Sequence, residues 1–262
     1  MPDKVNLDNI SIVLNKPRHP ENIGAAARAI CNMGIGRLVV VDPQNYDPHR
    51  ASRMATHAAS HVIEGMEIFD DLETALGSYR YIAGTTARLG GQRQAVTSPR
   101  TFAEGLIPIA RENPVAIVFG PEDRGLANED IRYCHVLINI PTDDFSSLNL
   151  AQAVMIVCHE IFSASLEGPS TFAPRLATRD ELEKMYAQLS EILVRISFIN
   201  PENPDHWING LRRFLNRLPL RTREVNIIRG VCRQINWYGT KSFEDGTLAQ
   251  QHTAHDLRKE GK

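Results

Sequence analysis

Residues 136–154 read VLINIPTDDFSSLNLAQAV, and this stretch decides the fold class. Its first five residues form a short apolar, branched run of the kind found in buried strands. A polar loop follows, and Ser147, a good N-cap residue, precedes an apolar run with helical spacing that extends to about residue 165. The stretch therefore predicts a strand that feeds a helix, which is the building block of a parallel sheet.

The same alternation recurs through residues 1–166. Strands are predicted at 10–14, 37–41, 79–85, 115–119 and 136–140. Helices are predicted at 22–33, 50–58, 71–76, 102–111 and 128–134, and from Ser147 onward. Strands that alternate with helices favour an α/β fold, with a parallel sheet covered by helices on both faces.

The remainder of the chain has a different pattern. Residues 167–178 contain Gly168, Pro169 and Pro174 and are predicted to be a linker. Residues 179–240 carry three apolar segments with helical spacing, which predict a small helical module. Three helices make a marginal core, so we expect the module to pack on the first domain or on a second copy of the chain. Residues 241–262 are polar and aperiodic, and we expect a frayed tail there.

The composition is that of an ordinary soluble globular protein. The 262 residues include 29 basic and 31 acidic residues, for a net charge of -2, and 42% are hydrophobic. Apolar runs such as 115–119 and 154–158 are far too short to span a membrane. The N-terminus lacks the pattern of a secretory signal, so the expected location is the cytoplasm.

Signatures of several common cofactors are missing from the sequence. Gly34 and Gly36 follow a helix and precede a strand, the reverse of the order in a dinucleotide fold, and no P-loop motif is present. His159 and Glu160 do not complete a zinc-binding motif. Four scattered cysteines without a CxxC pair are interpreted as reduced core thiols: Cys31, Cys134, Cys158 and Cys232. We therefore expect no NAD, P-loop or zinc chemistry, and no metal.

Positive charge is concentrated near the C-terminus. Residues 171–240 hold 11 basic and 7 acidic residues, whereas residues 1–170 hold 14 and 20. The basic group consists of Arg212, Arg213, Arg217, Arg221, Arg223, Arg229 and Arg233. Two interpretations explain this cluster: a solvated helix face, or a surface that binds the phosphates of a nucleic acid. The planar guanidinium group of arginine suits the phosphate-binding surface.

Three loops that follow predicted strands contain small, polar or glycine-rich residues. The first runs from Asn15 into a helix that holds Asn22, Gly24 and Arg28. The second is FGPEDRGL at 119–126, and the third is the loop and helix start at 140–154. Taken singly, each is explained as an N-cap, a turn or a capped helix. Together they lie where a parallel sheet presents its ligand crevice.

In this order the loops resemble the three motifs of the SPOUT methyltransferases. N-x-G-x-x-x-R recurs as 22–28, FGxExxGL as 119–126 and SLNLAxAV as 147–154. Residues 198–199, 211–214 and 224–230 resemble the helical extension of those SPOUT members that methylate the ribose of nucleotide 32 in the tRNA anticodon loop. The resemblance covers about 240 residues, all but the tail.

The resemblance implies a SPOUT fold, in which the C-terminal part of the sheet forms a trefoil knot. It also implies a homodimer that binds S-adenosylmethionine in the knot and tRNA as substrate. By motif, the residues that contact the cofactor are Thr85, Thr86, Ala87, Gly120, Ile140, Ser147, Leu148 and Asn149.

The resemblance also makes Arg28 the catalytic residue, with Asn22 and Ser147 in supporting positions. A guanidinium group normally keeps its proton in proteins, which leaves two roles open for Arg28. Either the site makes it a general base for the ribose hydroxyl, or it stays charged and stabilises the developing alkoxide. Two other functions also remain open: the same reaction at another tRNA or rRNA position, and a knotted RNA-binding protein without catalysis. The sequence does not determine the base at the target nucleotide, the set of tRNAs or the role of the tail.

Overall fold

The computed structural model describes residues 7–87, 96–144, 147–166 and 174–259. Within them, parallel strands form one seven-stranded sheet in the order β3-β2-β1-β6-β4-β7-β5. The strands are β1 (Ile10–Asn15), β2 (Arg37–Val41), β3 (Glu67–Phe69), β4 (Tyr81–Thr85), β5 (Val96–Thr97), β6 (Val115–Phe119) and β7 (Val136–Ile138). The predicted parallel sheet is confirmed, and β3 and β5 are short strands that the sequence did not indicate.

The strands at the centre of the sheet are apolar because both of their faces are covered. All six residues of β1 and all five of β6 are buried. Along β1, Ile10, Ile12 and Leu14 belong to one core cluster, and Val13 belongs to another. Side chains alternate between the two faces of a strand, so these clusters mark the two faces of the sheet.

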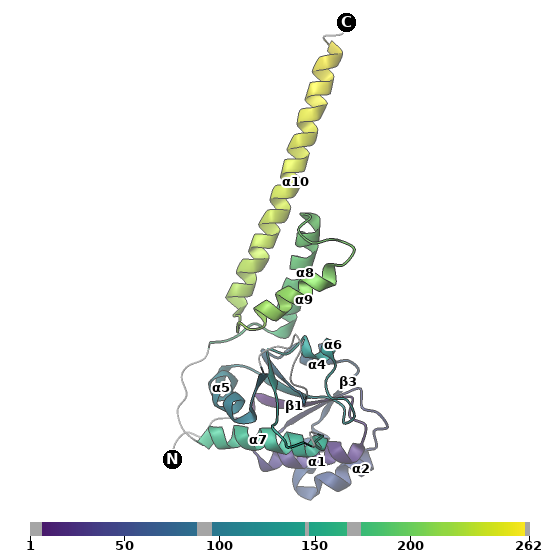
Figure 1. Cartoon of the computed structure of the whole chain (residues 1–262), viewed down its shortest axis with the longest axis vertical. Helices are drawn as coiled ribbons and strands as arrows, with labels where there is room; N and C mark the ends of the chain where they lie inside the picture. The colour runs from purple at the N-terminus through teal and green to yellow at the C-terminus, as the bar shows by residue number, and fades with distance from the viewer. Residues whose placement is uncertain (1–6, 88–95, 145–146, 167–173, 260–262) are drawn as a thin grey trace.

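Helices cover both faces, as predicted (Figure 1). The helices of the first domain are α1 (Pro20–Asn32), α2 (Pro48–Ala55), the 3-10 helix η1 (His57–Ala59), α3 (Ser60–Glu64), α4 (Leu72–Leu76), α5 (Pro99–Glu112), α6 (Asn128–Ile131) and α7 (Leu150–Leu166). Residues of α1, α5 and α7 contribute to one core cluster, and residues of α4 and α6 contribute to the other.

The start of α7 differs from the prediction. Ser147 was expected to cap this helix, but α7 begins at Leu150. The side-chain oxygen of Asn149 accepts hydrogen bonds from the amides of Ala151 and Gln152, at 2.9 and 3.4 Å. Asparagine is as good an N-cap as serine, and Asn149 is the residue placed to satisfy these amides. Ser147 is therefore free of a capping role and belongs to the preceding loop.

The knot remains a prediction. The segment that would form it lies between β6 and α7, and residues 145–146 within that segment lie outside the described residues.

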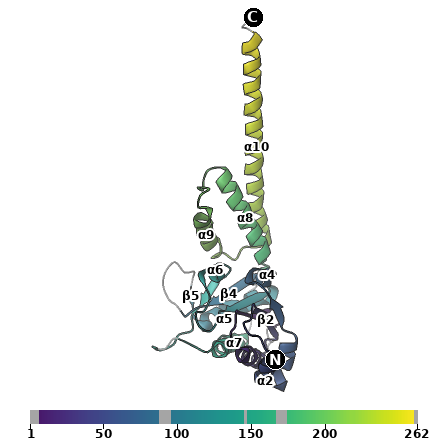
Figure 2. The same ribbon diagram turned by 90° about the vertical axis from the view of Figure 1, so that its right-hand side faces the viewer.

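Three helices form the C-terminal module: α8 (Arg179–Arg195), α9 (Pro204–Leu215) and α10 (Thr222–Lys259). Its small core consists of Ala177, Leu182, Met185, Tyr186 and Val225. The expected frayed tail from residue 241 is wrong as far as residue 259, because α10 continues through it and stands out from the body (Figure 2). Adding residues to an existing helix requires less conformational free energy than nucleating a new one. No proline interrupts this stretch, so the helix continues.

The module packs on the first domain, which is one of the two arrangements expected. Arg179 is fully buried, forms an ion pair with Glu183, and donates from Nη1 to the carbonyl of Tyr133 at 3.3 Å. Asn216 Nδ2 donates to the carbonyl of Arg132 at 3.1 Å. These polar contacts attach the module beside α6, at the face of the sheet that α4 and α6 cover.

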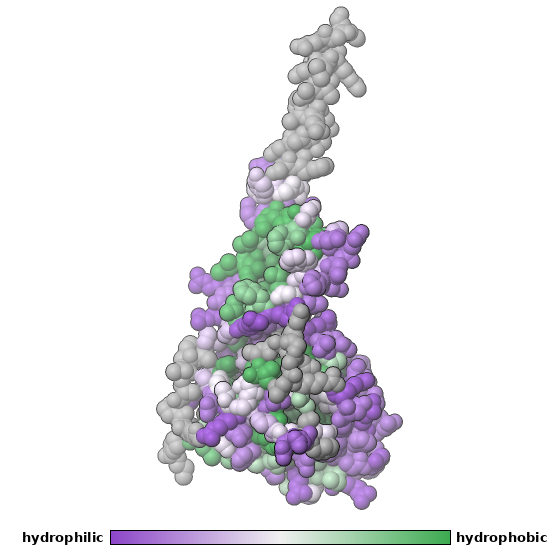
Figure 3. All heavy atoms as spheres, viewed as in Figure 1, coloured by the Kyte–Doolittle hydropathy of each residue, from purple (hydrophilic) through white to green (hydrophobic). Residues whose placement is uncertain are grey.

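The module also presents apolar side chains on its surface. Figure 3 shows them gathered over α10 and the adjoining part of α8. On α10 they include Ile227, Val231 and Ile235, which follow one another at four-residue spacing and therefore share one side of the helix. The helix thus has an apolar row that faces away from the small core of the module.

Candidate functional site

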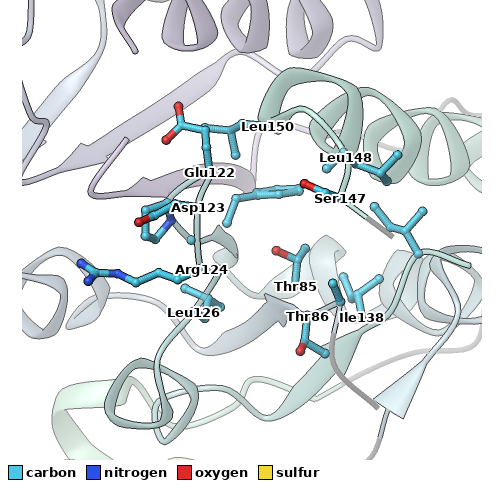
Figure 4. A pocket seen from close by; sticks show the side chains of 17 residues that line it. Thr85, Thr86, Glu122, Asp123, Arg124, Leu126, Ile138, Ser147, Leu148 and Leu150 are labelled. Carbon is cyan, nitrogen blue, oxygen red and sulfur yellow. The ribbon is translucent and has the colours of Figure 1, made fainter. Parts of the chain in front are cut away.

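A pocket of about 300 Å³ lies at the carboxyl ends of β4, β6 and β7 (Figure 4). The three strands are neighbours in the sheet, with β4 between β6 and β7. Open parallel sheets bind ligands at this edge, because the loops that follow adjacent strands meet there. A pocket therefore lies at the edge of the sheet where the sequence analysis placed its candidate cofactor site.

The pocket brings together most of the predicted cofactor-binding residues. Those that line it are Thr85, Thr86, Ala87, Gly120, Ile140, Ser147 and Leu148. They come from three loops that are separated in the sequence, yet they surround a single space. Asn149 was also predicted there, but it does not line the pocket; it caps α7 instead.

The remaining lining residues were not predicted as cofactor contacts, although all of them except Ile138 lie within the second and third motif loops. The apolar ones are Phe119, Pro121, Leu126, Ile138, Leu150 and Ala153, and the polar or glycine positions are Glu122, Asp123, Arg124 and Gly125. The motif loops themselves were therefore the signal that could have identified them. In Figure 4 the side chains of Glu122 and Arg124 extend away from the space between Thr85 and Ser147. The pocket thus combines apolar side chains with hydroxyl, charged and backbone groups.

Hydrogen bonds fix the backbone of the loop after β4. Thr85 Oγ1 donates to the carbonyl of Val118 at 3.2 Å, and the amide of Thr86 donates to the carbonyl of Ile138 at 2.9 Å. Asn139 Nδ2 donates to the carbonyl of Thr86, also at 2.9 Å. Residues 85 and 86 are therefore tied to both neighbouring strands.

Gly120 is required by the turn that follows β6. A Cβ atom at this position would lie 2.3 Å from the carbonyl carbon of Gly125 and from the amide nitrogen of Leu126. Gly125 has a φ of +66°, a conformation that favours glycine. The two glycines let residues 120–126 fold back closely enough to form one wall of the pocket.

Glu122 connects this turn to the first loop. Its Oε2 accepts from the amide of Arg18 at 2.9 Å, and its Oε1 accepts from Asn22 Nδ2 at 2.7 Å and from the amide of His19 at 3.4 Å. Burial raises the pKa of Glu122, but the hydrogen bonds from Asn22, Arg18 and His19 outweigh it and hold the pKa below its usual value. The carboxylate is therefore ionised at neutral pH. Sequence reasoning treated it as part of an acidic turn and missed this role.

Asn22 also contacts the third loop. Its Oδ1 accepts from Asn149 Nδ2 at 2.9 Å. Asn22 and Glu122 thus link the three motif segments into one hydrogen-bonded group beside the pocket. This group brings Asn149 to the site, although in a different place from the one predicted.

Arg28, the predicted catalytic residue, lies outside this group. It is exposed on α1 and does not line the pocket. Six residues separate it from Asn22, which is about 9 Å along a helix axis. Within the described part of the chain its guanidinium group has no hydrogen bond or ion pair, and Asn22 does not contact it.

The small residues of α1 have a packing role. A Cβ atom at Gly24 would lie 1.9 Å from the carbonyl oxygen of Ala51 in α2. The small residue at this position thus admits a neighbouring helix close to the backbone. α2 therefore packs directly on the backbone of α1.

No group of histidine, cysteine, aspartate and glutamate suited to a metal ion occurs among the described residues. None of the helices in that part of the chain is long and apolar enough to cross a membrane. All four cysteines are free, and Cys134, Cys158 and Cys232 are buried, as expected for core thiols.

Known proteins match both parts of the chain. Residues 9–159 match the SpoU rRNA Methylase family, and residues 180–247 match the C-terminal domain of the tRNA methyltransferase TrmJ. The tRNA (cytidine/uridine/adenosine-2'-O-)-methyltransferase TrmJ of Pseudomonas aeruginosa is 37% identical over 242 residues, which is 87% of this chain and 94% of that protein.

This chain belongs to the TrmJ family of SpoU-type RNA methyltransferases. The tRNA (cytidine/uridine-2'-O-)-methyltransferase TrmJ of Escherichia coli is 35% identical, over 87% of this chain and 96% of its own length. The crystal structure of TrmJ from Z. mobilis has a TM-score of 0.75 at 30% identity and covers 86% of this chain and 98% of that one. The protein is therefore an RNA methyltransferase, and both its domain and its helical module are TrmJ-like.

Proposed function

We propose that this chain transfers the methyl group of S-adenosylmethionine to the ribose 2'-hydroxyl of nucleotide 32 in the tRNA anticodon loop. The observation that carries the proposal is the single pocket made by seven residues from two separate motif segments and the loop after β4. The names of the TrmJ relatives support a 2'-O-methyl product on tRNA. Nucleotide 32 rests on the resemblance of the C-terminal module.

The residues of the pocket fit this methyl donor. Apolar side chains such as Leu126, Ile138 and Leu148 offer surface for an adenine ring. The backbone of residues 85–87, Gly120 and Ile140 supplies polar groups at fixed positions. A volume of about 300 Å³ is at the lower end of the range for small-molecule sites. When bound, the donor supplies an activated methyl group, and its transfer needs no metal.

The protein contributes orientation and proton removal to this reaction. Ser147 lines the pocket and is exposed, so its hydroxyl is available to an incoming ribose. Asn22 is fixed by Glu122 and Asn149 and would hold the first loop beside the ribose. Arg28 would act either as the base or as a cation that stabilises the alkoxide. The second role needs no loss of its proton and is the simpler one.

We also propose a homodimer in which both chains shape each RNA site. α7 supports this arrangement, because apolar side chains occur on nearly all of its sides: Val154 and Val157 are buried, while Met155 and Ile156 are partly exposed. A helix that is apolar all round usually has neighbours on every side. A second copy would cover this surface and would also bring another Arg28 into the assembly.

The arginine cluster of the module supports tRNA binding, with one correction. Arg212 is not available for phosphates, because it forms an ion pair with Glu183 at 2.5 Å and lies over the ring of Tyr186. Arg217, Arg221 and Arg223 are exposed and remain candidates, with Arg213 partly exposed beside them. Phosphate contacts would make tRNA binding weaken steeply with salt. Free cysteines and a tRNA substrate both suit the cytoplasm, the location expected from the sequence.

Calorimetry tests the cofactor assignment. The purified chain should bind S-adenosylmethionine in the presence of a chelator, and at 100 times the dissociation constant the ligand should stabilise the fold by about 2.7 kcal/mol. Ala153→Phe should fill the pocket and abolish the heat, whereas Gln152→Phe, one position away and exposed, should not. Equal binding by both variants would place the donor elsewhere.

A further inference from the structure

The outward side of α9 carries large aromatic residues. Trp207 and Phe214 are seven residues apart, so they share one side of the helix, and 52% and 61% of their surfaces are exposed. Ile208, about 100° round the helix from Trp207, is buried. Core packing therefore accounts for Ile208 and leaves the two rings unexplained.

A third ring joins them from the connection between α8 and α9. Phe198 is 64% exposed, and its ring centroid lies 6.1 Å from that of Trp207 at an interplanar angle of 61°. The preceding residue, Ser197, has a φ of +59°, a conformation that is unfavourable for a residue with a side chain. Ile199 is almost fully buried and anchors the connection. The backbone thus holds Phe198 beside Trp207, with both rings open to solvent.

Two arginines lie near Phe214 in the sequence. Arg213 lies immediately before Phe214, and its Nε donates to the carbonyl of Asn209 at 3.3 Å; Arg217 lies just beyond the end of α9 and is exposed. Gly210, between Trp207 and Phe214, leaves open space where a side chain would lie. In Figure 2, α9 and α10 lie on either side of α8, so α10 does not cover this side of α9.

The composition of this surface separates it from the apolar row on α10. That row consists of the aliphatic residues Ile227, Val231 and Ile235, which suit packing against another protein surface. The surface of α9 instead combines planar rings with guanidinium groups, in a segment whose net charge is positive. Rings stack on bases of any sequence, and arginines bind the phosphates between them.

We propose that the outward side of α9, together with Phe198, is a stacking surface for unpaired bases of the RNA substrate. We call these residues, Phe198, Trp207, Arg213, Phe214 and Arg217, the α9 surface. The inference rests on the proposed function for its RNA partner and adds where and how that RNA is held. Unpaired nucleotides are the target, because base pairs hide the faces of their bases inside a helix.

Tryptophan fluorescence tests this contact directly. The chain has two tryptophans, and Trp237→Phe leaves Trp207 as the only indole. Stacking on a base should quench its emission when the full-length protein is titrated with a 12-nucleotide oligouridine or with a tRNA transcript. A blunt RNA duplex of the same length should quench much less at equal bound fraction.

Affinity measurements separate stacking from charge. Trp207→Leu keeps apolar bulk but removes the ring, and should raise the tRNA dissociation constant at least fivefold without changing its dependence on salt. Trp207→Phe should restore most of the affinity. Arg217→Gln should instead reduce the salt slope by about one. Trp237→Leu is the matched control, because Trp237 is equally exposed but lies on α10.

Two outcomes would overturn the inference. One is unchanged tRNA affinity in Trp207→Leu together with no quenching of Trp207 emission in Trp237→Phe, with the melting temperatures of both variants equal to that of the wild type. The other is a change in oligomeric state by light scattering in Trp207→Leu, which would make the α9 surface a protein interface. Neither readout needs methyl transfer. A protein that shows quenching without methylating tRNA would contradict the proposed function and leave this inference standing.

Discussion

Replacing Glu122 with glutamine tests how the motif segments are held together. The carboxylate accepts hydrogen bonds from the amides of Arg18 and His19 and from the side chain of Asn22. A glutamine keeps one oxygen, which can still face Asn22 and His19. Its NH2 group would then face the amide of Arg18, so that two donors oppose each other where the structure has a bond of 2.9 Å.

The size of the effect follows from these contacts. A hydrogen bond to a charged group stabilises a folded protein by about 1.5–3 kcal/mol. Because Glu122 is partly exposed, the substitution should weaken the attachment of the first loop by about 1–2 kcal/mol. If the first loop must be ordered for transfer, the rate falls by about five- to thirtyfold. Affinity for S-adenosylmethionine should stay within a few-fold, because the carboxylate extends away from the pocket (Figure 4).

The assay is single-turnover methyl transfer to a tRNA transcript, with cofactor affinity measured by calorimetry. Asp123→Asn is the matched control: Asp123 adjoins Glu122 and forms an exposed ion pair with Arg18 at 2.9 Å, which should contribute little. A wild-type rate in Glu122→Gln, or equal losses in the two variants, would refute the reasoning.

Three further predictions concern the stability of the fold, each measured by urea unfolding. Gly24→Ala should lower the free energy of unfolding by about 1–3 kcal/mol because the added Cβ would overlap Ala51. Gly105→Ala in α5, where a Cβ would have open space, should not lower it. Similar losses in both variants would contradict the close packing of α1 on α2. Burial lowers the pKa of His135 to about 3, below the value of 6.5 expected in the unfolded chain. The neutral imidazole therefore contributes stability that is fully present above pH 6.5 and is lost as the pH falls toward 3, at up to about 1.4 kcal/mol per pH unit. His135→Gln should lack this part of the pH dependence of stability, and an unchanged dependence would exclude the contribution of His135. Glu183→Gln should lower the free energy of unfolding by about 3 kcal/mol, because it leaves buried Arg179 without its ion pair. Glu191→Gln, at an exposed position of the same helix, should leave the stability unchanged. Unchanged stability in Glu183→Gln would show that this ion pair does not hold the module.

Much of the architecture follows from local patterns. Alternating apolar strands and helices predict the parallel sheet, and the motif loops predict most of the pocket lining, because loops after adjacent parallel strands must meet. The start of α7 was misplaced since Ser147 and Asn149 are both good caps, and sequence alone does not say which side chain faces the free amides. The helical continuation of α10 was missed because polar sequence without periodicity resembles a frayed end.

Long-range polar contacts were beyond the sequence. Glu122 and Asn22 are 100 residues apart, and nothing in the spacing of either motif shows that they share a hydrogen bond. Arg212 is one member of a charged run, and only its position against Glu183 and Tyr186 distinguishes it from its neighbours. The group that approaches Gly24, the carbonyl of Ala51 in α2, is likewise a property of the tertiary structure.

The central claim is methyl transfer to one ribose of tRNA, and mass spectrometry of the product tests it most directly. Purified full-length protein is incubated with S-adenosylmethionine, a chelator and an unmodified tRNA transcript, and the RNA is then digested and sequenced by fragment mass. The account predicts one added methyl group on the ribose of nucleotide 32, and none with Arg28→Ala. A methyl group on a base or at another nucleotide, or no methylation by a protein that binds both substrates, would contradict it.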